Sequence, residues 1–280
     1  MPALFVLLWS TGFIGAKLGL PYAEPLTFLS LRMALVVGLL LLLALIGRAP
    51  WPTDRATVGH NAVAGLLLHA GYLGGVFNAI HLGMSAGLVA LIVGLQPVLT
   101  ALAAAVLLKE RVTPLQWLGF ALGLVGVALV VGGRVAVAGM TPAAFALATV
   151  ALVSISAGTL YQKRYCGSMD FRTGGVIQYS MAGLVLLVLA MATETMHIDW
   201  SGEFVFALLW LCLVLSVGAV SLLYCLIKRG EAARVSSLFY LTPPVTALMA
   251  FALFGETLSR TAMAGMALTA VAVALVLRSG

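Results

Sequence analysis

A histidine in the middle of an apolar stretch is the residue whose type and position most clearly suggest chemistry. His69 lies near the centre of a predicted helix over 58–80, and Asn61, Gly65 and Tyr72 share its helical face because the spacings are 4, 4 and 3 residues. A histidine that faces a water-filled cavity could hydrogen-bond a carboxylate or carry a proton. We therefore expect His69 and Tyr72 to line a polar pathway. The alternative is a neutral histidine bonded to a neighbouring helix.

Two proline sites fall near the middle of two other apolar stretches. Gln96 precedes Pro97, and Thr242 precedes Pro243 and Pro244. Proline removes a backbone donor and frees the carbonyl about one turn earlier. We expect both sites to bend their helices beside a cavity and to serve as hinges, although a kink used only for packing gives the same pattern.

Hydroxyl and aromatic side chains on other predicted helices could complete an apolar cavity for a small molecule. Arg32 lies one to two turns inside a predicted helix and could pair with a substrate carboxylate, snorkel to the outer interface or anchor the preceding loop. No Asp or Glu lies at the centre of any predicted helix, which favours neutral, aromatic or zwitterionic solutes with weak or absent ion coupling. The further cavity candidates are Trp9, Phe13, Ser154, Tyr161, Ser221, Tyr224 and Tyr240.

The composition places these residues in a membrane protein. Of 280 residues, 62% are hydrophobic and only 9% are charged, whereas a soluble domain carries charges on roughly a quarter of its positions. The net charge of +6 comes from short basic clusters between apolar runs, which is typical of membrane topology signals and gives no indication of a nucleic-acid partner.

No arrangement typical of an enzyme or a cofactor protein accompanies this composition. The three cysteines have neither metal-ligand nor disulfide-framework spacing, and the four histidines are scattered. No nucleophile with its base and no carboxylate pair is evident. We therefore expect no catalytic residues, no metal and no cofactor, and we disfavour a membrane enzyme or a haem protein.

Division of the chain at its Gly, Pro and charged punctuation predicts ten membrane-spanning helices and an all-α polytopic fold. About 20 apolar residues are needed to cross a bilayer. The predicted ranges are 3–20, 26–46, 58–80, 85–108, 114–132, 143–162, 173–192, 204–227, 235–254 and 260–278.

The basic residues predict the orientation. With a cytoplasmic N-terminus, the outside loops hold only Arg134 and Arg260, while eleven Lys and Arg residues fall in the inside loops and the C-terminal end. This asymmetry predicts that both termini are cytoplasmic.

The chain also matches itself at a constant offset of 146 residues. Ser10 meets Ser156, Pro97 meets Pro243, and similar matches recur at further polar and glycine positions. Because each half has five predicted helices, the second copy must enter the membrane from the opposite side, which gives two inverted repeats. We predict the first repeat over 1–134, a linker and the start of helix six over 135–146, and the second repeat over 147–280.

Several short motifs resemble those of a known family. Trp9-Ser-Thr-Gly-Phe-Ile-Gly-Ala-Lys17, Ser-Leu-Arg32-Met and Gln96-Pro97 in the first half, and Thr242-Pro-Pro244 in the second, resemble the EamA-type repeats of the drug/metabolite transporter superfamily. The resemblance covers essentially the whole chain. It implies ten helices, cytoplasmic termini and export of metabolites or drugs. The second repeat departs from the first at Gln178, which stands where the first has Arg32.

Together these observations predict a multi-pass secondary transporter of the bacterial inner membrane, working by alternating access as a monomer or weak dimer. Its expected partners are the lipid bilayer and a small-molecule substrate, with aromatic or neutral amino acids as the leading class. The alternatives are a multidrug or organic-cation exporter, a nucleoside or purine-type exporter and, from a different class, a channel.

Overall fold

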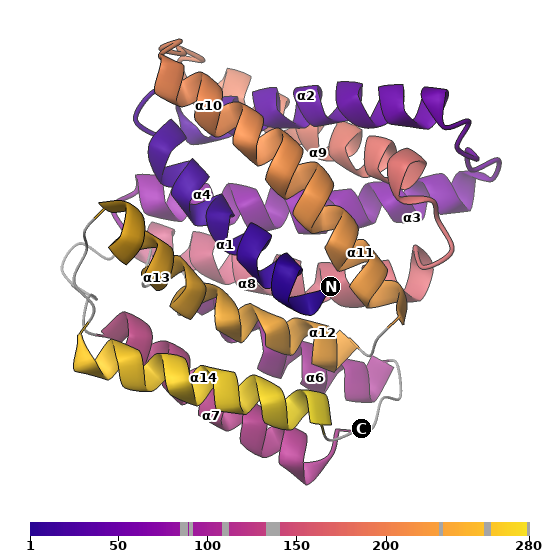
Figure 1. Ribbon diagram of the computed structural model, residues 1–280. Coiled ribbons are helices and arrows are strands. Elements are labelled where there is room, and N and C mark those ends of the chain that lie inside the picture. Colours follow the sequence, from indigo (N-terminus) through magenta and orange to yellow (C-terminus); the bar gives the residue numbers. More distant parts are fainter. Residues whose placement is uncertain are drawn as a thin grey trace.

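The protein is almost entirely helical in the computed structural model (Figure 1), which describes residues 1–84, 89, 92–107, 112–132, 141–229, 232–254 and 259–278. Within these residues the β-type pairing is limited to one isolated antiparallel bridge between Ala23 and Ile198. The high helical content follows from the apolar sequence, since helices satisfy their own backbone hydrogen bonds without water.

The first half begins with two separate helices, followed by one long interrupted helical segment and two further helices. These elements are α1 (Pro2–Gly19), α2 (Pro25–Ile46), the continuous run α3 (Arg55–Gly65), η1 (Leu66–Gly71) and α4 (Tyr72–His81), then α6 (Gln96–Leu107) and α7 (Pro114–Gly132).

The second half follows the same order with interruptions in its third and fourth segments. Its elements are α8 (Pro142–Tyr165), α9 (Phe171–Thr193), the continuous run α10 (Gly202–Trp210), η2 (Leu211–Ala219) and α11 (Val220–Arg229), then α12 (Ala232–Ser237), η3 (Leu238–Leu241), α13 (Thr242–Phe254) and α14 (Arg260–Arg278). These segments agree with the predicted ranges to within a few residues, except that part of 85–108 lies outside the described residues.

Polar residues between the apolar runs start several helices. Asp54 caps α3 by accepting a hydrogen bond from the Thr57 backbone N–H at 2.7 Å, and Ser201 caps α10 through the Phe204 N–H at 3.1 Å. A side-chain oxygen at this position satisfies one of the backbone donors that the first turn leaves unpaired. The loop sequences therefore fix where these helices begin.

Six helical segments in the described residues are long and apolar enough to cross a membrane, and three further apolar helices are shorter. The six are Pro25–Ile46, Arg55–His81, Pro142–Tyr165, Phe171–Thr193, Gly202–Arg229 and Arg260–Arg278, and the shorter three are Pro2–Ala16, Gln96–Val106 and Pro114–Leu129. The protein is thus a helical membrane protein with several spans.

The main helix pairs join the two halves of the chain. Helix α2 lies beside α9, and the two run in opposite directions (Figure 1): the start of α2 meets Glu194 after the end of α9, while Thr173 at the start of α9 donates to the Pro50 carbonyl at 2.9 Å. Helices α7 and α14 also pair in opposite directions, since Gly119 lies against Val276 and Gly126 against Thr269.

Departures from regular α-helix occur at corresponding places in the halves. The π-helical η1 covers Leu66–Gly71, and its equivalents at an offset of 146 residues fall within the π-helical η2. A turn at 94–95 precedes Pro97, and the 3₁₀ segment η3 precedes Pro243. Wider and tighter turns of this kind are often found at functional positions.

Candidate functional site

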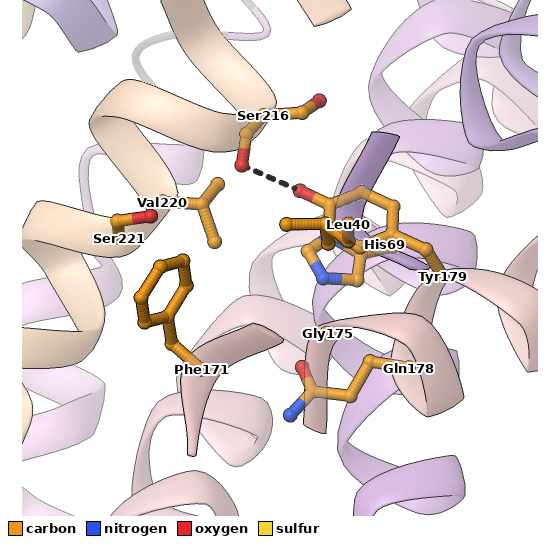
Figure 2. Close-up of a pocket in the computed structure, with 9 residues that line it drawn as sticks. All are labelled: Leu40, His69, Phe171, Gly175, Gln178, Tyr179, Ser216, Val220 and Ser221. Atoms are coloured by element: carbon orange, nitrogen blue, oxygen red, sulfur yellow. Dashed lines mark hydrogen bonds between the residues drawn. The ribbon is translucent and has the colours of Figure 1, made fainter. Parts of the chain in front are cut away.

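Residues from five helical elements converge on one pocket (Figure 2). About 270 Å³ lies between the lining atoms when the open mouth is included, whereas the enclosed space is only about 10 Å³, roughly the room that one water molecule needs. Leu40 comes from α2 and His69 from η1, while α9, η2 and α11 supply the remaining walls. The complete lining is Leu40, His69, Phe171, Gly175, Gln178, Tyr179, Ser216, Val220 and Ser221.

The aromatic wall of the pocket is a stacked pair of rings. The ring centroids of His69 and Tyr179 are 4.0 Å apart and their planes differ by 17°. The Tyr179 hydroxyl donates to the Ser216 carbonyl at 3.3 Å (Figure 2). His69 is buried, and its Nε2 has no hydrogen-bond partner within the described residues. A buried polar atom left without a partner is costly, so this nitrogen is available to a bound molecule or to water.

A buried arginine stands directly behind this wall. Arg32 is only 2% exposed, and its Nε and Nη2 both donate to the Ser216 Oγ, at 3.1 and 2.9 Å. Of the three roles that the sequence left open for Arg32, snorkelling to the interface and anchoring the preceding loop do not match this buried position. The guanidinium lies in the interior, one side chain away from the pocket.

A second polar cluster surrounds Gln178, which also lines the pocket. Its Nε2 donates to Asn61 Oδ1 at 3.1 Å and to Gln162 Oε1 at 3.0 Å. Gly65 lets α3 approach α9 here, because a β-carbon on that glycine would lie 2.3 Å from the Gln178 carbonyl oxygen. The amide is therefore held in place by three helices.

Of the residues singled out from the sequence, His69 and Ser221 line this pocket. Tyr72 is buried close enough to Arg32 to interact with it electrostatically. Ser154 is buried on α8 against Gly71. These four residues lie in or near one region of the structure.

Three of the predicted aromatic residues make other contacts. Trp9 packs against the Phe5 and Phe239 rings at 5.3 and 5.2 Å. Tyr240 is fully buried and donates to the Phe120 carbonyl at 3.1 Å, and the Tyr161 hydroxyl bonds His60 Nδ1 at 2.8 Å. Their hydroxyls and rings are engaged in contacts between helices, and none of these residues lines the pocket.

Gln96 and Thr242, which correspond through the repeat, are also outside the pocket. The Gln96 Nε2 donates to the Thr159 Oγ1 at 3.4 Å, while the Gln96 Oε1 and the Thr242 Oγ1 are buried without a partner in the described residues. The side chains of Phe13 and Tyr224 lie outside the described part of the structure.

The three prolines stand at the beginnings of helices. Pro97 lies in the first turn of α6, and Pro243 and Pro244 lie in the first turn of α13. In both cases one residue, Gln96 or Thr242, separates the irregular turn from the proline, whose lost backbone donor permits the irregularity. Their use as hinges remains a prediction.

Sequence reasoning missed most of the pocket wall, including Gln178, Tyr179 and Ser216. One signal was present: Gln178 is the repeat equivalent of Arg32, and both side chains are 2% exposed in the interior. Following each intramembrane polar residue to its equivalent in the other half would have found Gln178. Nothing comparable marked Ser216, because serine is common where transmembrane helices pack.

The fold and the pocket define a polytopic helical membrane protein with a small, largely neutral internal site. Comparison with protein families identifies the family: the model of the EamA-like transporter family matches residues 2–132 and again residues 142–278. The chain belongs to this family and is a transmembrane transporter. The predicted family resemblance is confirmed, and the family indicates a transporter and not an enzyme.

Curated relatives match the chain over most of its length. The uncharacterized transporter YvbV of Bacillus subtilis (strain 168) is 28% identical, covering 98% of this chain and 89% of the relative. The uncharacterized inner membrane transporter YedA of Escherichia coli (strain K12) is 29% identical with the same coverage. A probable amino-acid metabolite efflux pump of Salmonella typhimurium (strain LT2) is 26% identical, covering 94% and 88%.

A solved crystal structure shares the fold. Its TM-score is 0.81 over 98% of this chain and 94% of the other, at 21% sequence identity. At this identity the likeness concerns the arrangement of the helices alone.

Proposed function

We propose that the protein exports small metabolites, with aromatic or neutral amino acids as the leading cargo, across the bacterial inner membrane by alternating access. The observation that carries this proposal is the pocket of His69, Gln178, Tyr179, Ser216 and Ser221, which combines a stacked aromatic surface with neutral hydrogen-bonding groups. Sites for small molecules commonly combine apolar walls with a few placed polar groups. The relatives named as amino-acid metabolite efflux pumps support the same cargo class.

The proposed architecture is ten spans in two inverted repeats over 1–134 and 147–280, joined through 135–146. Antiparallel pairing of α2 with α9 and of α7 with α14 supports the inversion. The distribution of basic residues supports cytoplasmic termini. A site between repeats of opposite orientation can open to either side when one bundle rocks against the other.

The other cargo classes fit the pocket less well. An exporter of organic cations would use a buried carboxylate, and in the described residues the pocket lining contains none. A purine could stack on the same aromatic wall, so purines and nucleosides are the second candidate class. Transport assays separate these classes directly.

The decisive experiment is counterflow in proteoliposomes of the purified protein. Vesicles preloaded with unlabelled phenylalanine, leucine, adenine or tetraethylammonium are given trace amounts of the same labelled compound outside. We expect saturable, transient accumulation of phenylalanine or leucine. Accumulation of adenine alone would transfer the proposal to purines, and linear flux without exchange would indicate a channel.

A further inference from the structure

Arg32 carries a charge that is buried inside the protein. The side chain is 2% exposed on α2, and none of the carboxylates in the described residues pairs with it; the ion pair found there joins Arg172 to Asp170 at 3.0 Å, at the start of α9. Charged groups inside a membrane protein are normally paired or mark a substrate pathway. Tyr72, Tyr179 and Cys212 lie close enough to interact electrostatically with the guanidinium but supply no formal charge.

The geometry at Arg32 is that of a carboxylate site filled by a hydroxyl. The Nε and Nη2 edge of a guanidinium matches the two oxygens of a carboxylate. Here both nitrogens converge on the single Ser216 Oγ, at 3.1 and 2.9 Å. One neutral oxygen therefore stands where two charged oxygens fit.

Ser216 connects this edge to the pocket. It lines the pocket, and its carbonyl accepts the Tyr179 hydroxyl at 3.3 Å (Figure 2). It also belongs to η2, whose π-helical turns are wider than those of an α-helix. A small rotation of this segment would take the Ser216 hydroxyl away from Arg32 and open the guanidinium to the pocket.

We propose that Arg32 is the residue that recognises a carboxylate on the cargo, and that the Ser216 hydroxyl occupies its binding edge while the pocket is empty. This inference rests on the proposed function, because it places one chemical group of the cargo in the same pocket. Cargo enters with its carboxylate toward Arg32 and its apolar side toward His69 and Tyr179. Molecules that lack the carboxylate leave the charge of Arg32 unbalanced and are carried poorly.

The test compares matched ligands that differ in this one group. Thermal stabilisation of the purified protein is titrated with phenylacetate and phenylacetamide, and counterflow is measured with phenylalanine and phenylalaninamide. We expect the wild type to bind phenylacetate about tenfold or more tightly than phenylacetamide, and to exchange phenylalanine about tenfold or more faster than phenylalaninamide. A factor of this size is typical of losing a hydrogen bond to a charged group. A wild type that binds acid and amide equally would overturn the proposal.

Three variants test whether the preference for a carboxylate comes from Arg32. Arg32→Gln abolishes the preference, whereas Ser216→Ala keeps it because the competing hydroxyl is removed and the guanidinium remains. Arg32→Lys weakens the preference, since a lysine keeps the charge without the two-pronged geometry. Arg55→Gln, at the exposed start of α3, is the matched control and keeps the wild-type preference.

The outcomes separate this inference from the proposed function. If phenylalanine is carried but Arg32→Gln retains the full preference for carboxylates, the transporter assignment stands and the role of Arg32 is wrong. If phenylacetate stabilises the wild type but not Arg32→Gln while no amino acid is carried, the carboxylate site stands and the cargo class is wrong. Should Arg32→Gln not fold, Arg32→Lys decides, and an unchanged preference in it counts against the proposal.

Discussion

Gly65 on α3 meets the backbone of Gln178 on α9 so closely that a β-carbon on the glycine would lie 2.3 Å from the carbonyl oxygen and 2.5 Å from the Cα atom. Backbone atoms cannot move aside as the end of a flexible side chain can. This contact therefore sets the distance between α3 and α9 and, with it, the position of the Gln178 amide at the pocket.

Replacing Gly65 by alanine should damage both stability and transport. We expect the free energy of unfolding to fall by about 1–3 kcal/mol, as for other overpacked sites, and the transport rate to fall because Gln178 is displaced. Thermal unfolding in detergent and counterflow measure the two effects. Gly59→Ala, on the same helix with nothing within 4 Å, is the control and should keep wild-type activity. Equal unfolding temperatures and equal counterflow rates in the two variants would show that the close approach of Gly65 to Gln178 matters for neither stability nor transport.

His69 should be required for transport but not for folding. We expect His69→Ala to reduce the counterflow rate about tenfold, since it removes the stacked ring and the unpaired Nε2 from the pocket wall. Fluorescence-detected size-exclusion chromatography should show an unchanged, monodisperse peak. His197→Ala, at an exposed position, is the matched control. Full flux in the His69 variant would remove this residue from the site. The same expectation holds for Tyr224, which rests on the sequence alone.

The contact between Glu24 and Thr195 should make stability depend on pH. The hydroxyl and backbone N–H of Thr195 bond the Glu24 carboxylate at 2.6 and 2.7 Å and hold the pKa of Glu24 below its ordinary value of 4.5. A lowered pKa stabilises the fold above the ordinary value, and this contribution is lost as the pH falls through the folded-state pKa. The stabilisation is thus complete at neutral pH and disappears below pH 4.5.

Thr195→Val tests this dependence. We expect its Tm to lie below that of the wild type at pH 7, and the difference to shrink as the pH is lowered through and below 4.5. Thr193→Val is the control, because that exposed hydroxyl bonds only the Leu189 carbonyl of its own helix, at 2.8 Å. A difference in Tm that is constant across the pH range would rule out the Glu24 contribution.

The proline sites should affect transport more than stability. Alanine at Pro97 or Pro243 restores a backbone donor beside the irregular turn and favours a continuous helix. We expect slower counterflow with an unchanged or raised Tm. Pro142→Ala, at the first position of α8, supplies the comparison, because proline is ordinarily tolerated there. Unaltered rates in all three variants would make the turns purely structural.

The proposed orientation can be checked by labelling single cysteines in cells. In a variant lacking Cys166, Cys212 and Cys225, we expect a cysteine replacing His197 to react with a membrane-impermeant maleimide from outside. A cysteine replacing Arg55 should react only after permeabilisation. The reverse pattern would contradict the predicted orientation.

The helices could be predicted from the sequence because the bilayer leaves few choices. Apolar runs of sufficient length must be helical, and polar residues such as Asp54 and Ser201 mark where they begin. The repeat was also readable, since Pro97 and Pro243 match at the same offset as the other polar positions. These features depend on local sequence, and the helices of the described residues agree with the predicted ranges to within a few residues.

The direction in which each side chain points was harder to predict. A helix that is apolar on all sides gives no pattern to show which face meets a neighbour. Tyr240 was therefore expected in the cavity but bonds the Phe120 carbonyl of α7. The π-helical turns add a second difficulty, because they change the register between Gly65 and Tyr72. Tyr72 consequently does not lie on the pocket wall, although regular α-helical spacing from Asn61 predicts that it shares a face with His69.

The pairing of α2 with α9 and of α7 with α14 has a consequence for how the two halves assemble and how the chain evolved. Most contacts between its described helices join one half to the other, as in an obligate dimer whose two subunits have been fused. Neither half holds a complete core, so we expect each to be degraded when made alone and rescued when both are made together as separate polypeptides. The segment that joins the halves then ensures that they are made in equal numbers, and it is not needed for them to assemble. An ancestor encoding one half would have needed to insert in both orientations to build the same molecule.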